Sequence, residues 1–198
     1  MSLPVEERRR ELSRGGGVCG VAGAAKRATP EQHSEAARMG YDAYVRCRCW
    51  EEGRLKPGPF PLEQIEIDDD DDMPSAPVVP GGHDLETLIA FDIWVMTCCE
   101  HEDMCLVSER IANIAGMGQL RRGLEAAGAA CATLRSVIPD TNEGRVEPAV
   151  SAVCLEELAA FEASHVYLAD PLGYDYMCAS LRKLFEASVA TGRPVIWT

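Results

Sequence analysis

Residues 41–49 read YDAYVRCRC, and the side chains along this stretch alternate with a period of two. Such alternation is typical of a β-strand that buries one face. That face of the predicted strand carries two thiols, and it comprises Tyr41, Ala43, Val45, Cys47 and Cys49. Gly53 and the Pro57-Gly58-Pro59 group follow, so we expect irregular chain beyond the strand.

The chain beyond residue 62 contains patterns of both secondary-structure types. We expect helices over 84–99, 106–115, 120–127, 148–163 and 178–190, and short strands over 62–67, 132–138, 166–169 and 194–197. Gly116 and Gly118 are expected to stop the second helix. The sequence therefore predicts an α/β (or α+β) fold, with one domain over residues 41–198 in which helices pack on a mixed sheet of four to five strands.

The helix expected over 84–99 begins at a capping residue, Asp84, and has an unusual distribution of apolar side chains. One face collects Leu85, Leu88, Ile89, Met96 and Cys99. Trp94 lies opposite, which predicts a helix buried on more than one side. Asp92 falls on the apolar face, and a buried carboxylate needs a partner, or its pKa rises. Either His101, His83 or an arginine supplies that partner, or the stripe reaches solvent at Asp92.

Residues 1–40 differ from the rest of the chain. They are basic, rich in Gly and Ala, and poor in large apolar side chains. Thr29-Pro30-Glu31-Gln32 combines a capping Thr, a Pro at the first helical position and a Gln three residues after the cap, which predicts the start of a short helix. We therefore expect a semi-ordered arm that is peripheral to the domain.

Charge limits the classes of partner. The 198 residues carry a net charge of −13, and the pI is about 4.7. This charge repels phosphate backbones, so we expect no nucleic acid on the main domain. It suits a basic protein such as a toxin, a cationic ligand, or solubility alone. The five consecutive aspartates Asp68–Asp72 predict a loop exposed to solvent.

Cysteine usage and the N-terminal sequence bear on location. The chain has nine cysteines, an odd number without the spacing of a disulfide framework, which indicates a reducing compartment. MSLPVEERRRELSR has no apolar stretch like that of a secretory signal. The longest apolar run, Leu88–Cys99, is short and contains Asp92, so we expect no membrane span. A cytoplasmic location is the resulting expectation.

Thiols and an imidazole form the strongest candidate site. Cys47 and Cys49 share one face of the first strand, and Cys99 and His101 follow the helix over 84–99. These four could supply the tetrahedral Cys and His set that zinc prefers, if the helix end packs on the strand. Asp92 or Glu102 could then act as a second-shell group or base. The competing interpretation is that the cysteines fill the core, as free cysteines often do.

Two segments resemble known families. The stretch from Gly40-Tyr41-Asp42 through Cys47-x-Cys49-x-Glu51-Glu52-Gly53 to Cys99-Glu100-His101-Glu102-Asp103-Met104 is similar to bacterial proteins with no assigned activity. The arm, with Leu12-Ser13-Arg14-Gly15-Gly16 and Ala24–Glu31, resembles the KGG-type repeats of bacterial stress proteins. Small acidic proteins of this general style include immunity proteins of polymorphic toxin systems. Neither resemblance implies a catalytic residue.

Three hypotheses for the function follow. The first is an acidic binding protein, an immunity-like inhibitor or regulator of a basic partner. The alternative is a small zinc-dependent enzyme, a hydrolase for example, centred on the Cys and His cluster; its metal would need an open coordination position. In the third, a structural zinc ion lies inside the binding protein, and folding then depends on metal without any chemistry. Whether the protein is an enzyme stays open at this point.

Overall fold

The computed structural model describes residues 40–141 and 143–198, and the arm expected over 1–40 lies outside these residues except for Gly40. Four strands form the main sheet: β1 (Gly40–Arg46), β4 (Cys105–Asn113), β5 (Gly144–Val146) and β6 (Val195–Trp197). Their order is β4-β1-β6-β5, and every neighbouring pair is antiparallel. The predicted combination of helices with a sheet of four to five strands is thus confirmed, but the sheet is antiparallel and not mixed, because every neighbouring pair runs in opposite directions.

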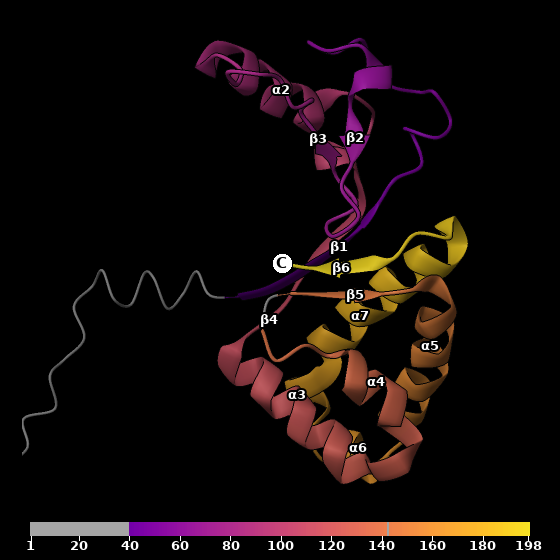
Figure 1. Ribbon diagram of the computed structural model, residues 1–198. Coiled ribbons are helices and arrows are strands. Elements are labelled where there is room, and N and C mark those ends of the chain that lie inside the picture. Colours follow the sequence, from indigo (N-terminus) through magenta and orange to yellow (C-terminus); the bar gives the residue numbers. More distant parts are fainter. Residues whose placement is uncertain (1–39, 142) are drawn as a thin grey trace, which may run out of the picture.

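Helices cover one face of this sheet (Figure 1). They are α3 (Ile114–Ala127), α4 (Ala132–Val137), α5 (Pro148–Glu162), α6 (His165–Ala169) and α7 (Pro171–Thr191), and a short 3₁₀ turn, η3 (Gly128–Cys131), joins the first two. Buried side chains of α3, α4, α5, α7 and all four strands form one hydrophobic core, and partly buried side chains of α6 pack against it. The sheet and these helices are called the body below.

A second unit, the cysteine module (residues 47–104), connects the end of β1 to the beginning of β4 and projects from the sheet there (Figure 1). It contains η1 (Leu62–Gln64), the hairpin of β2 (Glu66–Ile67) and β3 (Pro74–Ser75), helix α2 (Leu85–Thr97) and η2 (Glu102–Met104). Its buried side chains form a separate cluster around Phe91 and Trp94. The module therefore has its own small core, distinct from that of the body.

Segment 106–115 was expected to be a helix, and this prediction is wrong. Residues Cys105–Asn113 form β4, which pairs with β1 from Gly40 opposite Asn113 to Arg46 opposite Cys105. The short apolar pattern of this segment suits either period, and pairing with a neighbouring strand decides between them. Gly116 and Gly118 do not stop a helix either, because α3 runs through both.

Two predicted strands are helices instead. Residues 132–138 contain α4, whose first turn is capped from α5: Glu157 accepts hydrogen bonds from the amides of Thr133 (3.1 Å) and Leu134 (2.7 Å). Residues 166–169 lie in α6, where the hydroxyl of Ser164 accepts a bond from the amide of Tyr167 (3.3 Å). A cap supplied by another helix leaves no local signal in the sequence.

Other boundaries agree more closely. The helices expected over 148–163 and 178–190 are α5 and α7, although α7 begins earlier, at Pro171. The last predicted strand is β6. Of the segment 62–67, which was expected to be a strand, only Glu66–Ile67 pair as β2, and Leu62–Gln64 form η1.

The run of five aspartates is the loop of the β2–β3 hairpin, and it lies against the body. The carbonyl oxygen of Asp71 accepts a hydrogen bond from the hydroxyl of Tyr44 in β1. The carbonyl oxygen of Asp69 accepts one from Arg145 in β5 at 2.8 Å. The side chains of Asp68 to Asp71 are exposed as expected, but Asp72 is buried.

Candidate metal centre

The first two candidate ligands lie just beyond β1 and not within it. The strand ends at Arg46, and the amide of Cys47 donates to the carbonyl oxygen of Met104 at 2.7 Å. The chain then turns, and the carbonyl oxygen of Cys49 accepts from the amide of Arg54 at 2.8 Å. The expectation that both thiols share a strand face is wrong. The turn allows two cysteines separated by one residue to point at a common centre.

The other two candidate ligands follow α2. This helix ends at Thr97, and the bend that follows contains Cys99 and His101 and leads to η2. The amide of Lys56 donates to the carbonyl oxygen of Cys98 at 2.7 Å, which fixes the bend against the segment after the first two ligands. Both ends of the cysteine module thus meet at one place.

The four ligand atoms form a compact group. The three sulfurs and the nearer ring nitrogen of His101 all lie within 4.8 Å of one another. Cys47 Sγ is 3.8 Å from Cys99 Sγ, and His101 Nδ1 is 3.3 Å from Cys49 Sγ and 3.9 Å from Cys99 Sγ. In a tetrahedral zinc site with Zn–S bonds of about 2.3 Å, two sulfurs are about 3.8 Å apart. The group could therefore hold a metal ion.

Burial makes these thiols poor acids in the absence of a cation. Burial is the main reason that the pKa of Cys47 is raised, and it also raises the pKa of Cys49, to about 12. Hydrogen bonds with the other thiols add to the rise at Cys49. A bound cation stabilises thiolates and would reverse this preference. The cluster is thus either a set of neutral thiols or the ligand set of a metal.

Neighbouring cysteines point elsewhere. Cys98 Sγ donates to the carbonyl oxygen of Val95 (3.5 Å), and Cys105 Sγ donates to that of Asp103 (3.3 Å). Three further buried cysteines belong to the core of the body, Cys131, Cys154 and Cys178. Core filling therefore accounts for these three. Cys47 and Cys49 also belong to the buried cluster of the module, but together with Cys99 they converge on His101.

Glu102 is adjacent in sequence to a candidate ligand, whereas Asp92 lies on the far face of α2. Glu102 directly follows His101, and its side chain is exposed. Asp92 lies on the exposed face of α2, while Phe91 and Trp94 on the opposite face are buried in the module. The apolar stripe predicted to be buried is therefore the solvent face of the helix. Within residues 40–141 and 143–198, Asp92 forms no hydrogen bond with either His101 or His83.

An ion-pair network beside the four candidate ligands joins the module to the body. Arg46 is 1% exposed, and it pairs through Nε with Asp72 (3.1 Å) and through Nη2 with Glu51 (2.8 Å). Arg193, between α7 and β6, contacts the same two carboxylates. Burial lowers the pKa of Arg193. Sequence reasoning missed this network, because alternation placed Arg46 on the polar face and no pattern marked Asp72.

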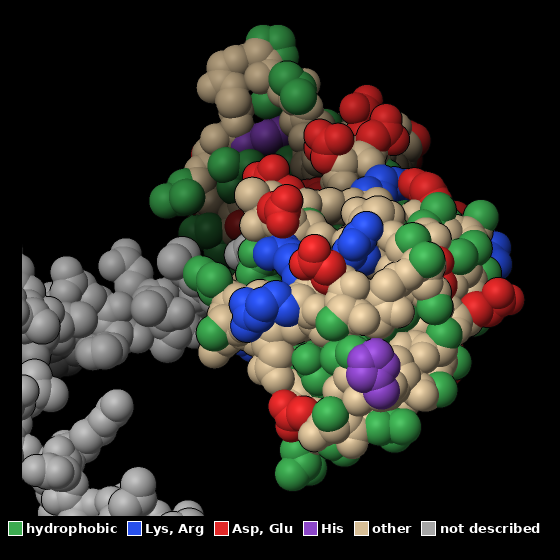
Figure 2. Space-filling model, turned by 90° about the horizontal axis from the view of Figure 1, so that it is seen from below, with side chains coloured by type: hydrophobic (Ala, Val, Ile, Leu, Met, Phe, Trp, Pro, Cys, Tyr) green, Lys and Arg blue, Asp and Glu red, His purple; other side chains and the backbone are tan. Residues whose placement is uncertain are grey.

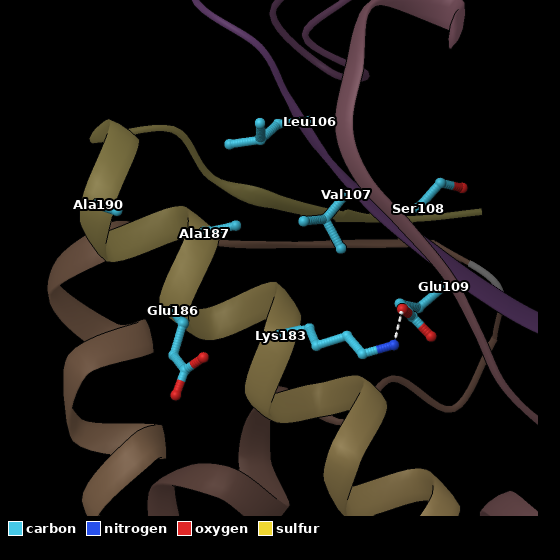
Figure 3. A pocket seen from close by; sticks show the side chains of 8 residues that line it. All are labelled: Leu106, Val107, Ser108, Glu109, Lys183, Glu186, Ala187 and Ala190. Carbon is cyan, nitrogen blue, oxygen red and sulfur yellow. Dashed lines mark hydrogen bonds and ion pairs between the residues drawn. The ribbon is translucent and has the colours of Figure 1, made fainter. Parts of the chain in front are cut away.

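A surface groove, separate from the candidate metal centre, lies between β4 and α7 (Figure 3). Glu109 lies across it, where it accepts hydrogen bonds from Lys183 (2.6 Å) and Ser180 (2.8 Å). Desolvation would raise the pKa of Glu109, but these bonds outweigh it and keep the pKa below its usual value. Glu109 thus already has hydrogen-bond partners from α7 on both of its oxygens.

No protein-family model, curated protein or solved structure matches the chain. Among the helices of the described part of the chain, none combines the length and the apolar character that crossing a membrane requires.

Proposed function

We propose that this chain is a binding protein, an immunity-like inhibitor or regulator, whose acidic module receives a basic protein and is held together by a structural zinc ion. The observation that carries the proposal is the distribution of charge. The cysteine module has fifteen Asp and Glu against three Lys and Arg, which is a net charge of −12 out of −13 for the whole chain. The acidity thus belongs to one projecting unit.

The donor set supports zinc as the metal. Zinc is a borderline-soft ion, and it accepts three soft thiolates and one imidazole in a tetrahedron. Four protein ligands complete that tetrahedron without water, as they do in structural sites, whereas catalytic sites keep one position open. This favours the structural role over the hydrolase hypothesis. The ion would join the two ends of the module.

Surface charge supports a basic partner. Figure 2, which views the molecule from below, shows several acidic side chains gathered in the upper part of the view. Exposed carboxylates concentrated on one unit raise the local concentration of a cationic partner and orient its approach. A basic protein is the partner class that this field favours.

Metal content tests the structural part of the proposal. Purified protein, dialysed against a mild chelator, should retain about one equivalent of zinc in elemental analysis. Trp50 and Trp94 pack in the module and Trp197 in the body. In a Trp197→Phe variant, stripping the metal with a strong chelator should therefore change the tryptophan emission. Metal-free protein with unchanged emission would remove the zinc site from the proposal.

Charge removal tests the partner class. The probe is a labelled peptide of alternating Lys and Gly, and binding is followed by fluorescence anisotropy at several salt concentrations. Replacing Asp69, Asp70 and Asp71 by Asn should weaken binding several-fold. A matched control replaces three exposed acids of the body, Glu125, Glu156 and Glu186, by Gln. Equal effects of the two triple variants would show that net charge alone, and not the module, attracts the peptide.

A further inference from the structure

The solvent face of α2 is apolar over most of its length. Five large side chains lie on it, with exposed fractions between 38% for Leu88 and 73% for Leu85; the others are Ile89, Ile93 and Met96. Single exposed apolar residues are ordinary, but a continuous stripe on one helix marks an interaction surface. We therefore expect this stripe to be covered by a binding partner.

The spacing of the stripe suits another helix. Leu85, Ile89, Asp92 and Met96 follow one another at intervals of four, three and four residues. Alternating intervals of three and four form the seam along which two helices pack. The seam covers eleven residue steps, about 16 Å at 1.5 Å per residue. An occupant helix of about three turns would match it.

The opposite face of α2 is packed against the module, so the position of the exposed stripe is fixed. Phe91 and Trp94 are buried, and the Trp94 Nε1 group donates to the carbonyl oxygen of Lys56 at 2.9 Å. Gly58 leaves the space under the Trp94 ring, because a Cβ at this glycine would lie 2.8 Å from it. Two of the candidate metal ligands, Cys99 and His101, follow directly after the helix. A preorganised surface loses little freedom on binding.

Charge decides between the possible occupants. Asp92 lies in the middle of the seam, and Asp84 and Glu86 stand at its beginning. A second copy would bring two Asp92 carboxylates into one apolar seam and two modules of charge −12 together. A membrane surface with anionic lipids would repel the module for the same reason. A helix with an apolar stripe and a Lys or Arg facing Asp92 has neither disadvantage.

We infer that the exposed face of α2 is the docking site for a basic amphipathic helix of the partner. The stripe formed by Leu85, Leu88, Ile89, Ile93 and Met96 supplies the apolar contact, and Asp92 pairs with a basic side chain in the middle of the partner's apolar face. This inference rests on the proposed function and locates its binding surface.

The test uses two synthetic peptides of about eighteen residues with the same Leu and Lys composition. In the first, Leu residues form one helical stripe with a single Lys at its centre, and in the second the order is scrambled. Anisotropy at physiological salt should give at least about tenfold tighter binding for the first. Ile89→Ser should weaken that binding at least about tenfold. The control is Leu172→Ser, because Leu172 is an exposed apolar residue of the body.

Reversal of charge tests the role of Asp92. Asp92→Lys should weaken the first peptide, and a peptide with Glu in place of its central Lys should recover most of the loss. If Ile89→Ser and Asp92→Lys leave the affinity unchanged while the Asp69, Asp70 and Asp71 triple variant weakens it, the docking site is overturned and the basic-partner function stands. If neither peptide binds at millimolar concentration, both fall.

Sedimentation and vesicles test the other occupants. Wild-type protein that is a dimer, with Ile89→Ser a monomer, would assign the stripe to a second copy and overturn the inference. Binding to vesicles of phosphatidylcholine and phosphatidylserine that Ile89→Ser abolishes would overturn it equally. A monomer that ignores such vesicles, and whose peptide binding depends on Ile89, is the expected result.

Discussion

The sulfur atoms of Cys47 and Cys99 lie 3.8 Å apart, although fifty-two positions separate the two residues in the sequence. The first follows the strand that leads out of the body, and the second precedes the strand that leads back. A metal ion between them would therefore close the module at its base. The core of the body does not include these residues, so metal loss should open the module and leave the body folded.

Adjacent cysteines give a direct test of this geometry. Cys99→Ser should abolish metal binding, because it removes one of the four ligands, whereas Cys98→Ser should keep about one equivalent, because the Cys98 thiol faces the carbonyl oxygen of Val95. Elemental analysis of both variants, with far-UV circular dichroism as a check of folding, makes the measurement. Equal metal loss in the two variants would mean that Cys98 takes part in the site.

Replacement of Asp72 should destabilise the protein far more than replacement of its neighbours. Asp72→Asn removes one of the two carboxylates that pair with Arg46, a side chain 1% exposed, while Glu51 remains. The loss of one buried hydrogen bond between charged groups should cost about 1.5–3 kcal/mol. Asp70→Asn is the control, since Asp70 is exposed, and it should change the free energy of unfolding by less than about 0.5 kcal/mol. Urea denaturation compares the two. Similar midpoints would contradict a structural role for this ion pair.

Long, periodic segments were predicted well from the sequence, and short ones were not. The α5 pattern repeats over fifteen residues, enough to separate a period of 3.6 from one of two. The six residues of α4 and the five of α6 are too few, and the Glu157 carboxylate that caps α4 is remote in sequence. For β4, pairing with β1 overrides a helical pattern.

The four ligands of the candidate site were identifiable because thiols and imidazoles are few and chemically distinct. Their convergence was not, since it depends on where β1 ends and on the bend after α2. The burial of α2 was predicted on the wrong face. Periodicity shows that two faces of a helix differ, but a module with a small core buries only one aromatic pair, Phe91 and Trp94, and leaves the aliphatic stripe in solvent.

The Glu157 cap predicts a specific dependence of stability on pH. Desolvation would raise the pKa of Glu157, but hydrogen bonds from the amides of Leu134 and Thr133 outweigh it and hold the pKa below its usual value. A carboxyl whose pKa is lowered by folding stabilises the protein above its unfolded pKa, about 4.3, and this contribution is lost as pH falls through the folded pKa. Glu157→Gln should therefore be less stable at pH 7, and the gap to wild type should shrink below pH 4.

Urea denaturation at pH 7 and at pH 3.5 measures that gap. Glu156→Gln is the matched control, because the neighbouring carboxyl is exposed and should give no gap at either pH. A Glu157→Gln gap of the same size at both pH values would show that the loss comes from the NH2 group that replaces one acceptor oxygen, and not from the loss of charge.

Two glycines of α3 should respond in opposite directions to the same substitution. Gly118→Ala should raise the free energy of unfolding by about 0.5–1 kcal/mol, because alanine favours a helix and the nearest atom to the new Cβ, 3.4 Å away, is the mobile end of Arg122. Gly123→Ala places its Cβ 2.8 Å from the hydroxyl of Tyr174, whose ring packs edge-on against Phe161 in the core. That ring cannot move without disturbing its neighbours, so overpacking should cost about 1–3 kcal/mol. Thermal and urea unfolding of the pair give the signs, and a stabilising Gly123→Ala would mean that the contact between α3 and α7 is looser than this packing implies.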